Sequence, residues 1–558
     1  MELLAHYALG QWIKGSGEGQ VLFNAVTGQP IARASTQGIN MGSLVAYARE
    51  KGNKNLRKMS FHERGLMLRA LALHLREHLP QFYALSYQTG ATKADSWVDI
   101  EGGIGNLFAY ASLRRRLPDT PFCLDGEHHP LGKTNAFMGH HLLVPKEGLA
   151  LHINAFNFPV WGMLEKIAVN LLAGMPAIVK PATLTSFLTQ AVVKEIVASN
   201  ILPEGALQLI CGSAGDILDH LNNQDVVTFT GSASTGLMLK SHPQILKENI
   251  PFTMEADSLN AIVLGDDVHP DMPEWDLFIK EVRKEITTKC GQKCTAVRRI
   301  FVPEDKIDQV EKALGQALAQ TVIGNPLNEK VRMGSLAGES QRKEVKAQVE
   351  KLLSSSQLVY GSMEGLDVLD ADATQGAFMS PLLLRNNQPF VQTNTHDTEP
   401  FGPVATLMPY KDLTAAIELV NMGKGSLVSS IVTHDQQKAK DYVLGAGTFH
   451  GRILVLDRDC AKENTGHGSP LPLLVHGGPG RAGGGEEMGG LRGIKHYMQR
   501  LAIQGSPDMI TAISGVYQPG AKGLTDGIHP FKKDYDSLRI GDQLTSARRV
   551  ITAEDINA

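Results

Sequence analysis

Residues 148–230 alternate short apolar runs with longer amphipathic stretches, and this alternation restricts the fold more than any other feature of the 558-residue chain. Strands alternating with helices at this spacing form βαβ units and a parallel sheet, so the predicted fold class is α/β. Ligands of such sheets bind outside the carboxyl ends of the strands, where Asn157, Lys180 and Gly231 lie. The predicted segments are strands 148–153, 176–179, 207–211 and 225–230, with helices 158–172 and 184–199.

The second half of the chain repeats this α/β pattern. Apolar runs predict strands at 261–264, 299–302, 404–408 and 453–456, and helical periodicity predicts helices at 273–289, 304–321 and 340–354. Upstream, Ser60 and Glu63 form the signature of a capping box at the start of a helix over 60–79. A further helical layer is predicted over 97–113.

Composition excludes several classes of protein. With 42% hydrophobic and 20% charged residues, the chain has ordinary globular composition, and its length allows two or three domains. Lys and Arg total 54 against 58 Asp and Glu, a balance that gives no reason to expect nucleic acid as a partner. No apolar run approaches the roughly 18 residues of a membrane span, and the first residues lack a secretion signal. We therefore expect a cytoplasmic protein.

The five cysteines have no CxxC spacing, so neither a disulfide framework nor a zinc site is predicted. Residues 119–147 are rich in Pro, Gly and His and include two His pairs, at 128–129 and 140–141, but no Cys or carboxylate completes a metal-ligand spacing. We interpret this segment as an excursion, such as a hairpin used in assembly. Residues 477–490 contain eight glycines, which predicts a loop that approaches a ligand or adopts left-handed turns.

A small-residue polar stretch, TKCGQKCTA at 288–296, follows one predicted helix. Cys294 with its basic neighbour Lys293 is a plausible nucleophile, since the thiolate is the form that attacks carbon. Taken alone, a free cysteine is more often a small buried hydrophobic residue. The other motifs of the chain decide between these interpretations.

Four local patterns accompany Cys294: NAFNFP at 154–159, KPAT at 180–183, FTGSASTG at 229–236 and EPFGPV at 399–404. With Met254-Glu255 and the GQKC run before and at Cys294, they resemble the NAD(P)-dependent aldehyde dehydrogenase superfamily in order and spacing, over nearly the whole chain. The resemblance implies a Rossmann-like cofactor domain, an α/β catalytic domain and a small oligomerisation element. It therefore predicts a homo-oligomer.

The resemblance also implies domain boundaries. The cofactor domain is expected at 1–118 and 148–256, the catalytic domain at 257–450, a return to the cofactor domain with the glycine-rich loop at 451–490, oligomerisation elements at 119–147 and 491–520, and a linker at 521–558.

The same resemblance assigns catalytic roles. Cys294 is the expected nucleophile, and the Asn157 side chain and the Cys294 backbone N–H are expected to stabilise the oxyanion of the tetrahedral adduct. Glu255 is the expected base for thioester hydrolysis, with a pKa that burial would raise toward neutrality. Lys166 and Glu487 occupy the positions of the family's proton-relay pair.

The dinucleotide fingerprint GxGxxG is absent, and the resemblance supplies a different cofactor site. Gly231 and Ser232 are expected to meet a pyrophosphate at a helix N-terminus, and Gly236 to allow close packing. Lys180 is expected on the adenine ribose and Glu399 on the nicotinamide ribose. Phe156 and Phe401, from the same motifs, complete the expected cofactor-binding set.

Cofactor preference depends on Thr183. Many NAD-preferring members carry a glutamate three residues after the lysine, where it binds the ribose 2′-hydroxyl and would repel a 2′-phosphate. Thr183 is neutral and can donate a hydrogen bond, so NADP is the predicted cofactor, with NAD as the alternative. A Thr183→Glu substitution is expected to shift the preference toward NAD.

Segments 97–105, 152–159 and 476–487 differ from generic members and resemble the dehydrogenase half of the bifunctional ring-opening enzymes of aerobic phenylacetate degradation. In those enzymes a MaoC-type hydratase domain follows the dehydrogenase, and residues 548–556 resemble the entry into that domain. The implied substrate is a CoA-linked semialdehyde of the 3-oxo-5,6-dehydrosuberyl-CoA type. The run Arg114–Arg116 is a candidate contact for the CoA phosphates.

Three alternatives remain open at this point. The substrate can be another CoA semialdehyde, such as 3,4-dehydroadipyl-CoA semialdehyde from benzoate breakdown. The enzyme can be an acylating dehydrogenase, although Glu255 argues against resolution by CoA. The chain can also be an inactive structural member of the superfamily. The glutamate motif reads MEADSLN at 254–260, where generic members carry a diglycine, so a different surrounding loop is expected.

Overall fold

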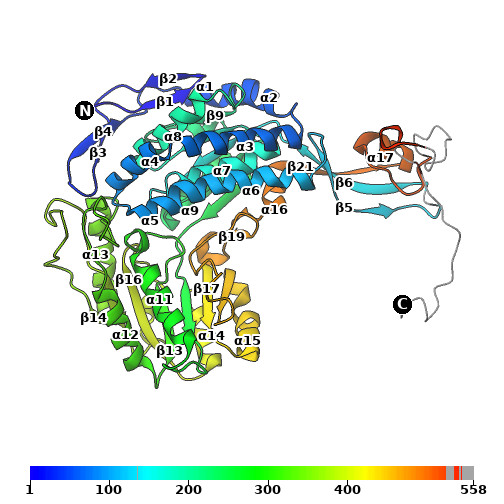
Figure 1. Ribbon diagram of the computed structural model, residues 1–558. Coiled ribbons are helices and arrows are strands. Elements are labelled where there is room, and N and C mark those ends of the chain that lie inside the picture. The colour runs from blue at the N-terminus through cyan, green and yellow to red at the C-terminus, as the bar shows by residue number, and fades with distance from the viewer. Residues whose placement is uncertain (135, 523–532, 539–541, 543–558) are drawn as a thin grey trace, which may run out of the picture. The chain divides into compact units, whose positions relative to one another are not determined.

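The computed structural model describes residues 1–134, 136–522, 533–538 and 542 (Figure 1). The chain divides into two compact units, which are described separately below. The larger unit contains Met1–Asp119 and Lys146–Tyr497, and the smaller contains Thr120–Pro145 and the chain from Met498 onward.

The first sheet of the larger unit has seven strands, in the order β11-β10-β7-β8-β9-β1-β2. The five strands from β11 to β9 are parallel, and β1 and β2 join antiparallel at the other edge. The strands are β11 (Phe252–Glu255), β10 (Val226–Thr230), β7 (Ala150–Ile153), β8 (Ala177–Lys180), β9 (Leu207–Leu209), β1 (Ala5–Ala8) and β2 (Gln11–Lys14). This sheet confirms the predicted α/β class.

Helices flank this sheet, and every residue of β7 is buried, as a parallel strand covered on both faces requires. The helices of this part are α1 (Met41–Tyr47), α2 (Lys54–Leu56), α3 (Phe61–Glu77), α4 (Leu79–Ser86), α5 (Lys93–Ser96), α6 (Gly102–Leu113), α7 (Trp161–Ala173), α8 (Ser186–Ala198), α9 (Ala233–Lys240) and α10 (Pro243–Lys247). The capping box predicted for Ser60 and Glu63 is present at the start of α3. A separate hairpin pairs β3 (Gln20–Phe23) with β4 (Pro30–Ala34).

Helix α7 begins later than its apolar pattern predicted, at Trp161 rather than residue 158. The carboxylate of Asp99 accepts hydrogen bonds from the backbone N–H of Val160 (3.0 Å) and of Trp161 (2.7 Å). Asp99 therefore satisfies first-turn amides that would otherwise lack partners. This cap comes from a distant segment, which local periodicity does not reveal.

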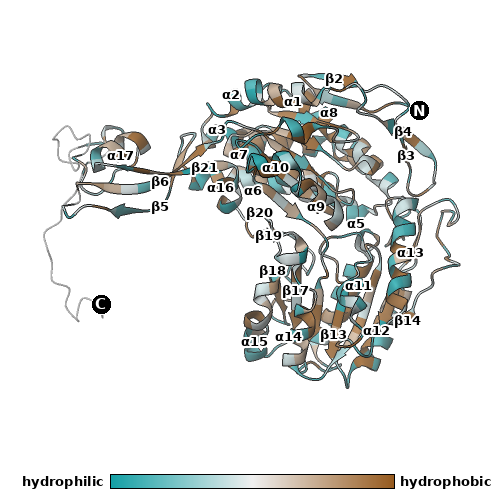
Figure 2. Cartoon of the chain, turned by 180° about the vertical axis from the view of Figure 1, so that it is seen from behind, coloured by the Kyte–Doolittle hydropathy of each residue, from teal (hydrophilic) through white to brown (hydrophobic). Residues whose placement is uncertain are grey.

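The second sheet also has seven strands, in the order β14-β15-β16-β13-β12-β17-β18. The strands are β14 (Gln357–Tyr360), β15 (Leu382–Arg385), β16 (Val404–Tyr410), β13 (Arg299–Pro303), β12 (Ala261–Leu264), β17 (Ser426–Val432) and β18 (His450–Leu456). The helices of this half are α11 (Pro273–Thr287), α12 (Ile307–Ala319), α13 (Glu339–Leu353), α14 (Leu413–Asn421) and α15 (Gln436–Ala446). Figure 2 shows hydrophobic residues along β13, in keeping with its full burial.

This sheet continues through Leu456, past the domain boundary expected at residue 450, because β18 pairs in parallel with β17 over its whole length. The backbone hydrogen bonds of β18 therefore belong to the catalytic half. The chain returns toward the first sheet only after this strand.

The glycine-rich segment is a short hairpin rather than an open loop. Strand β19 (Val475–Gly477) pairs antiparallel with β20 (Glu486–Met488). A Cβ atom at Gly483, whose φ is +110°, would lie 2.1 Å from the backbone oxygen of Met254. The glycines thus allow this backbone to approach β11 directly before Glu255, and Gly480, Gly483 and Gly484 adopt the left-handed conformation that the sequence predicted. Helix α16 (Leu491–His496) follows within the larger unit, although an oligomerisation element was expected from residue 491.

The smaller unit contains a three-stranded antiparallel sheet in the order β21-β6-β5. Strands β5 (Cys123–Pro130) and β6 (Met138–Pro145) form the hairpin expected within 119–147, and β21 (Met498–Gly505) and α17 (Pro507–Ser514) follow. The His140 ring contacts the carbonyl of Gly126 (3.1 Å) and the side chain of Gln518 (3.3 Å). Most of the linker expected at 521–558 lies outside the described residues.

Among the described residues, none of the helices has both the length and the apolar character needed to cross a membrane.

Candidate active site

The loop that carries Cys294 begins with an unusual backbone. Helix α11 ends at Thr287, and the next turn places Lys289, Cys290 and Gly291 in the left-handed region, with φ of +52°, +52° and +66°. A left-handed conformation costs about 1–2 kcal/mol for each residue other than glycine. The backbone N–H of Lys289 donates to the buried carboxylate of Asp95 at 2.7 Å. Such contacts with distant segments retain a strained turn.

Two buried side chains hold the backbone carbonyl groups of this loop. The Arg298 guanidinium donates to the carbonyl oxygens of Gly291 (2.9 Å) and Lys293 (3.2 Å). The Asn260 amide donates to the carbonyl oxygen of Cys294 at 2.8 Å. Asn260 and Arg298 lie beside β12 and β13, so the second sheet fixes the position of the cysteine.

Cys294 lies beside two groups from other parts of the chain, Glu255 at the end of β11 and His476 in β19. One ligand atom of each of the three side chains lies within 4.8 Å of the other two. The Glu255 carboxylate is 3.4 Å from Nε2 of His476, and both side chains are buried, at 3% and 4% exposure. The thiol of Cys294 interacts with the same carboxylate.

The thiol of Cys294 is not preformed as a thiolate. Part of the residue is accessible to solvent. Burial of the thiol nevertheless raises its pKa well above the usual value, and the neighbouring Glu255 raises that pKa further. Lys293 acts in the opposite direction, but its ammonium is 2.7 Å from the carboxylate of Glu285. The basic neighbour therefore favours the thiolate, as a cationic residue should, but burial and Glu255 outweigh its effect on the pKa of Cys294. A base must take the thiol proton.

Glu255 was expected to have a pKa raised by burial, and the structure contradicts this. Burial does raise the pKa of this carboxyl, but the His476 imidazole, followed by Lys166 and the Cys294 thiol, outweighs burial and holds the pKa below its usual value. The second carboxylate oxygen, Oε1, is buried and makes no hydrogen bond within the described residues. Glu255 is thus an ionised base with one oxygen left for a proton donor.

Asn157 lies just beyond the carboxyl end of β7, next to the loop of Cys294. We call the group of Cys294, Glu255, His476 and Asn157 the catalytic corner. Its side-chain Nδ2 donates to the backbone oxygen of Gln292, two residues before Cys294, at 3.0 Å. An asparagine amide has two hydrogens, so a second donor remains for an oxyanion formed near the cysteine. The structure therefore brings Asn157, Glu255 and Cys294 together.

Lys166 is buried on α7, at 4% exposure, with its ammonium 3.1 Å from Oε1 of Glu165. Glu165 also accepts a hydrogen bond from the Trp161 indole at 2.7 Å. The backbone of Glu487 pairs with that of His476, but its side chain lies outside the described residues. The relay between Lys166 and Glu487 consequently stays a prediction.

The proposed pyrophosphate site lies at the start of α9. Ser232 caps this helix by accepting a hydrogen bond from the Thr235 N–H at 3.4 Å. A Cβ atom at Gly236 would lie 2.5 Å from the sulfur of Met254, so a larger residue here would displace that side chain. Gly231 precedes the cap, and Asp257 accepts a hydrogen bond from the Ala233 N–H at 2.9 Å. Asp257 belongs to the segment MEADSLN at 254–260, which departs from the generic diglycine motif.

Glu399 offers an acceptor oxygen that makes no hydrogen bond. Its Oε2 accepts from the Ser258 N–H at 3.1 Å, whereas Oε1 is buried, makes no hydrogen bond within the described residues and lies 3.7 Å from Nε of Arg298. Burial raises the pKa of Glu399 to about 7, against the opposing effect of Arg298. Phe401 lies under the Arg298 guanidinium at 5.4 Å and meets the Phe156 ring edge-on at 5.9 Å. An unsatisfied acceptor beside aromatic rings fits the hydroxyls of a nucleotide ribose.

Lys180 ends β8, and Thr183 follows in a 3₁₀ turn (Thr183–Thr185). Burial lowers the pKa of Lys180. In the part of the chain that the structure describes, no carboxylate contacts its ammonium. These residues, with Gly231, Ser232 and Glu399, fit a dinucleotide at the carboxyl ends of the first sheet.

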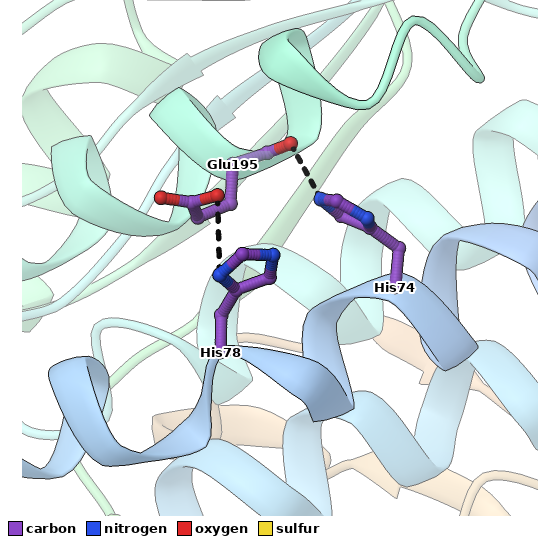
Figure 3. A group of neighbouring side chains, drawn as sticks. All are labelled: His74, His78 and Glu195. Atoms are coloured by element: carbon purple, nitrogen blue, oxygen red, sulfur yellow. Dashed lines mark hydrogen bonds and ion pairs between the residues drawn. The ribbon is translucent and has the colours of Figure 1, made fainter.

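A second group of polar side chains lies away from this corner (Figure 3). His74 at the end of α3 and His78 just beyond it face Glu195 of α8. Nε2 of His74 is 3.1 Å from the backbone oxygen of Glu195, and Nδ1 of His78 is 3.4 Å from its carboxylate. The nitrogen of His74 that faces the group is thus already hydrogen-bonded. We interpret the group as a polar contact between α3 and α8.

The sequence interpretation missed His476 as a site residue. It was noted only as part of the segment 476–487, and its partner Glu255 lies far away in the chain. The available signal was a histidine directly before a glycine pair that departs from the generic pattern. Sequence alone does not show that β19 packs beside β11.

A cysteine beside a buried carboxylate and an asparagine amide, at the carboxyl ends of a parallel α/β sheet, is the arrangement of a thiol-dependent enzyme. The model of the aldehyde dehydrogenase family matches residues 12–502. The chain belongs to this family, and it is an NAD(P)-dependent aldehyde oxidoreductase.

Two curated relatives illustrate the similarity. The chain is 40% identical over 477 residues to a 3,4-dehydroadipyl-CoA semialdehyde dehydrogenase of Aromatoleum evansii, covering 85% of this chain and 93% of that protein. It is 47% identical over 228 residues to the protein MaoC of Klebsiella aerogenes, covering 40% of this chain and 65% of that protein.

Solved structures share the fold. Betaine aldehyde dehydrogenase of Staphylococcus aureus, in a point mutant solved with NAD⁺, has a TM-score of 0.78 at 21% identity, over 89% of this chain and 96% of that chain. Lactaldehyde dehydrogenase of Escherichia coli has a TM-score of 0.77 at 21% identity, over 90% and 99%. At such identities the likeness shows the fold alone.

Proposed function

We propose that this enzyme oxidises a CoA-linked semialdehyde to the carboxylic acid, with NADP as the electron acceptor. The observation that supports the substrate class most strongly is the 40% identity to a 3,4-dehydroadipyl-CoA semialdehyde dehydrogenase over 93% of that protein. The chain's own residues supply the thiol, the base and the oxyanion donor that the reaction needs.

The proposed reaction begins with transfer of the Cys294 proton to Glu255, because the thiol is protonated at rest. The sulfur then adds to the aldehyde carbon, and the Asn157 amide stabilises the resulting oxyanion. A bound nicotinamide supplies the hydride acceptor. Hydride loss to that acceptor would leave a thioester on Cys294. Glu255, after passing the first proton to solvent, is again ionised and removes a proton from the water that hydrolyses the thioester.

The preference for NADP rests on Lys180 and Thr183. An ammonium without a carboxylate neighbour favours a 2′-phosphate, and the neutral Thr183 does not repel one. Lys180 and Glu399 would hold the two riboses, and the amides at the start of α9 would meet the pyrophosphate.

Two CoA semialdehydes are candidates. 3,4-Dehydroadipyl-CoA semialdehyde is the substrate in the name of the Aromatoleum evansii relative. The similarity to a MaoC protein, together with the segment resemblances described above, favours instead the 3-oxo-5,6-dehydrosuberyl-CoA semialdehyde of phenylacetate degradation. On that proposal the dehydrogenase works with a fused or associated MaoC-type hydratase, as a homo-oligomer in the cytoplasm.

The test is steady-state oxidation of both CoA semialdehydes with NADP and with NAD, using the free acid as the expected product. Product analysis with and without added CoA distinguishes hydrolysis from acyl transfer. A CoA thioester formed only in the presence of CoA would favour the acylating alternative. Activity with simple aldehydes but with neither CoA semialdehyde would contradict the proposed substrate class.

A further inference from the structure

The buried His476 has no role in the proposed reaction so far, yet it contacts the base directly. Its Nε2 lies 3.4 Å from the Glu255 carboxylate, and the exposures of the two side chains are 4% and 3%. An ionised carboxylate in such a place is costly unless a hydrogen-bond donor or a cation compensates for the lost water. His476 is in contact with this carboxylate and can do so.

The backbone around His476 is arranged to bring this ring to Glu255. The residue sits in β19, opposite Glu487 of β20, at the start of the glycine-rich hairpin. The N–H of Ala256, next to Glu255, donates to the carbonyl of Ala482 in this hairpin at 3.1 Å. The hairpin is therefore hydrogen-bonded to the chain directly after Glu255.

We propose that His476 is the positioning residue for Glu255, holding its carboxylate ionised and directed at the Cys294 thiol. The inference rests on the proposed function, since it assigns a role within the same thiol chemistry. Glu255 is then available as a base for the thiol proton and later for the hydrolytic water. Without His476, burial would dominate and the carboxyl would bind a proton at a higher pH.

Other charged groups also act on Glu255 and His476. Lys166 and Glu165 act on the corner from α7, and Lys293 and the Cys294 thiol act from the catalytic loop. Lys166 favours the ionised form of Glu255, but it contacts Glu165 at 3.1 Å, while His476 contacts Glu255 itself. The larger effect on Glu255 is therefore expected from His476.

The test uses p-nitrophenyl acetate, an ester that acylates a reactive cysteine and needs neither NADP nor a CoA substrate. The burst of p-nitrophenol reports acylation of Cys294, and the steady rate reports hydrolysis of the acyl-enzyme. Because Glu255 acts as a base above its pKa, hydrolysis is lost as the pH falls through that pKa. His476→Phe raises the pKa and moves this loss to higher pH, by about one unit or more.

Three variants separate positioning from general damage. His476→Asn keeps a hydrogen-bond donor. It is expected to shift the acid limb, the part of the pH profile in which hydrolysis is lost as the pH falls, less than His476→Phe does. Replacing His476 in a Glu255→Gln background is expected to add little, because the group it positions is gone. His6→Asn is the control, since His6 is a buried histidine in β1, near the opposite edge of the sheet from β11.

The outcomes are distinct. A shifted acid limb in both His476 variants, smaller for Asn, supports the inference. An unshifted limb with a normal burst overturns it, as do effects that simply add in the double variant. A wild-type chain that gives no burst would instead contradict the thiol chemistry on which the proposed function depends.

Discussion

The catalytic corner and the cofactor edge, by which we mean the carboxyl ends of the first sheet with Lys180, Thr183, Gly231, Ser232 and Glu399, satisfy their polar groups in different ways. At the corner, Glu255 is paired with His476, and Lys293 with Glu285, so the buried charges balance within the protein. At the edge, Lys180 has no carboxylate partner among the described residues, and Oε1 of Glu399, although 3.7 Å from the Arg298 guanidinium, accepts no hydrogen bond there. The corner is preorganised for proton transfer, whereas the edge has polar groups for a ligand to satisfy.

This difference predicts separable effects of substitution. Changes at the corner should alter rates and pH dependence while cofactor affinity is retained. Changes at the edge should alter cofactor affinity and preference while the reactivity of the thiol is retained.

The largest effect is expected for Cys294→Ala. Loss of the nucleophile should lower kcat by about 10³-fold or more, with little change in the dissociation constant for NADP. Steady-state kinetics and cofactor titration by fluorescence measure the two quantities. Cys290→Ala is a matched control, because Cys290 is fully buried and lies only four residues away. Comparable losses in both variants would mean that the loop, rather than the thiol at 294, is at fault.

A second expectation concerns Thr183→Glu at the edge. A carboxylate there should repel a 2′-phosphate and accept hydrogen bonds from a 2′-hydroxyl, so the ratio of kcat/KM for NADP over NAD should fall about 10- to 100-fold, or roughly 1.4–2.7 kcal/mol. Thr183→Ser serves as the neutral control. An unchanged ratio would remove Thr183 from the cofactor site.

Much of the fold and of the candidate site was predictable from the sequence, and part was not. The alternation over 148–230 predicted the α/β class, and the motif spacing predicted which residues to examine around Cys294. The pairing of His476 with Glu255 was not predictable, because it depends on packing between segments far apart in the chain. For the same reason the pKa of Glu255 was predicted in the wrong direction, since burial was considered without the partner.

A smaller effect is expected for Asp257→Asn. The asparagine oxygen can still accept a hydrogen bond from the Ala233 N–H, but the negative charge near a bound pyrophosphate is removed. The dissociation constant for NADP should therefore decrease about two- to five-fold, corresponding to roughly 0.4–1 kcal/mol. Calorimetric titration measures the change. Weaker binding in the variant would show that the carboxylate supports the site rather than opposing the ligand.

The smallest effect is expected for replacement of Arg114–Arg116 by alanine. Arg115 and Arg116 are exposed in a 3₁₀ turn after α6, where solvent and salt screen their charges. If they contact the CoA phosphates, KM for a CoA-linked semialdehyde should rise about two- to five-fold, while KM for a simple aldehyde stays the same. Equal changes for both substrates would exclude these arginines from the CoA site.

The most direct measurement is a single turnover of the Glu255→Gln variant with NADP and a CoA semialdehyde. Since the base for hydrolysis is absent, the variant should reduce about one equivalent of NADP in total and retain an acyl group on the peptide that contains Cys294, detected by mass spectrometry. Slow acylation is expected, because Glu255 also takes the thiol proton. NADP reduction without an acyl group on Cys294, or with continued turnover to the free acid, would contradict the proposed reaction.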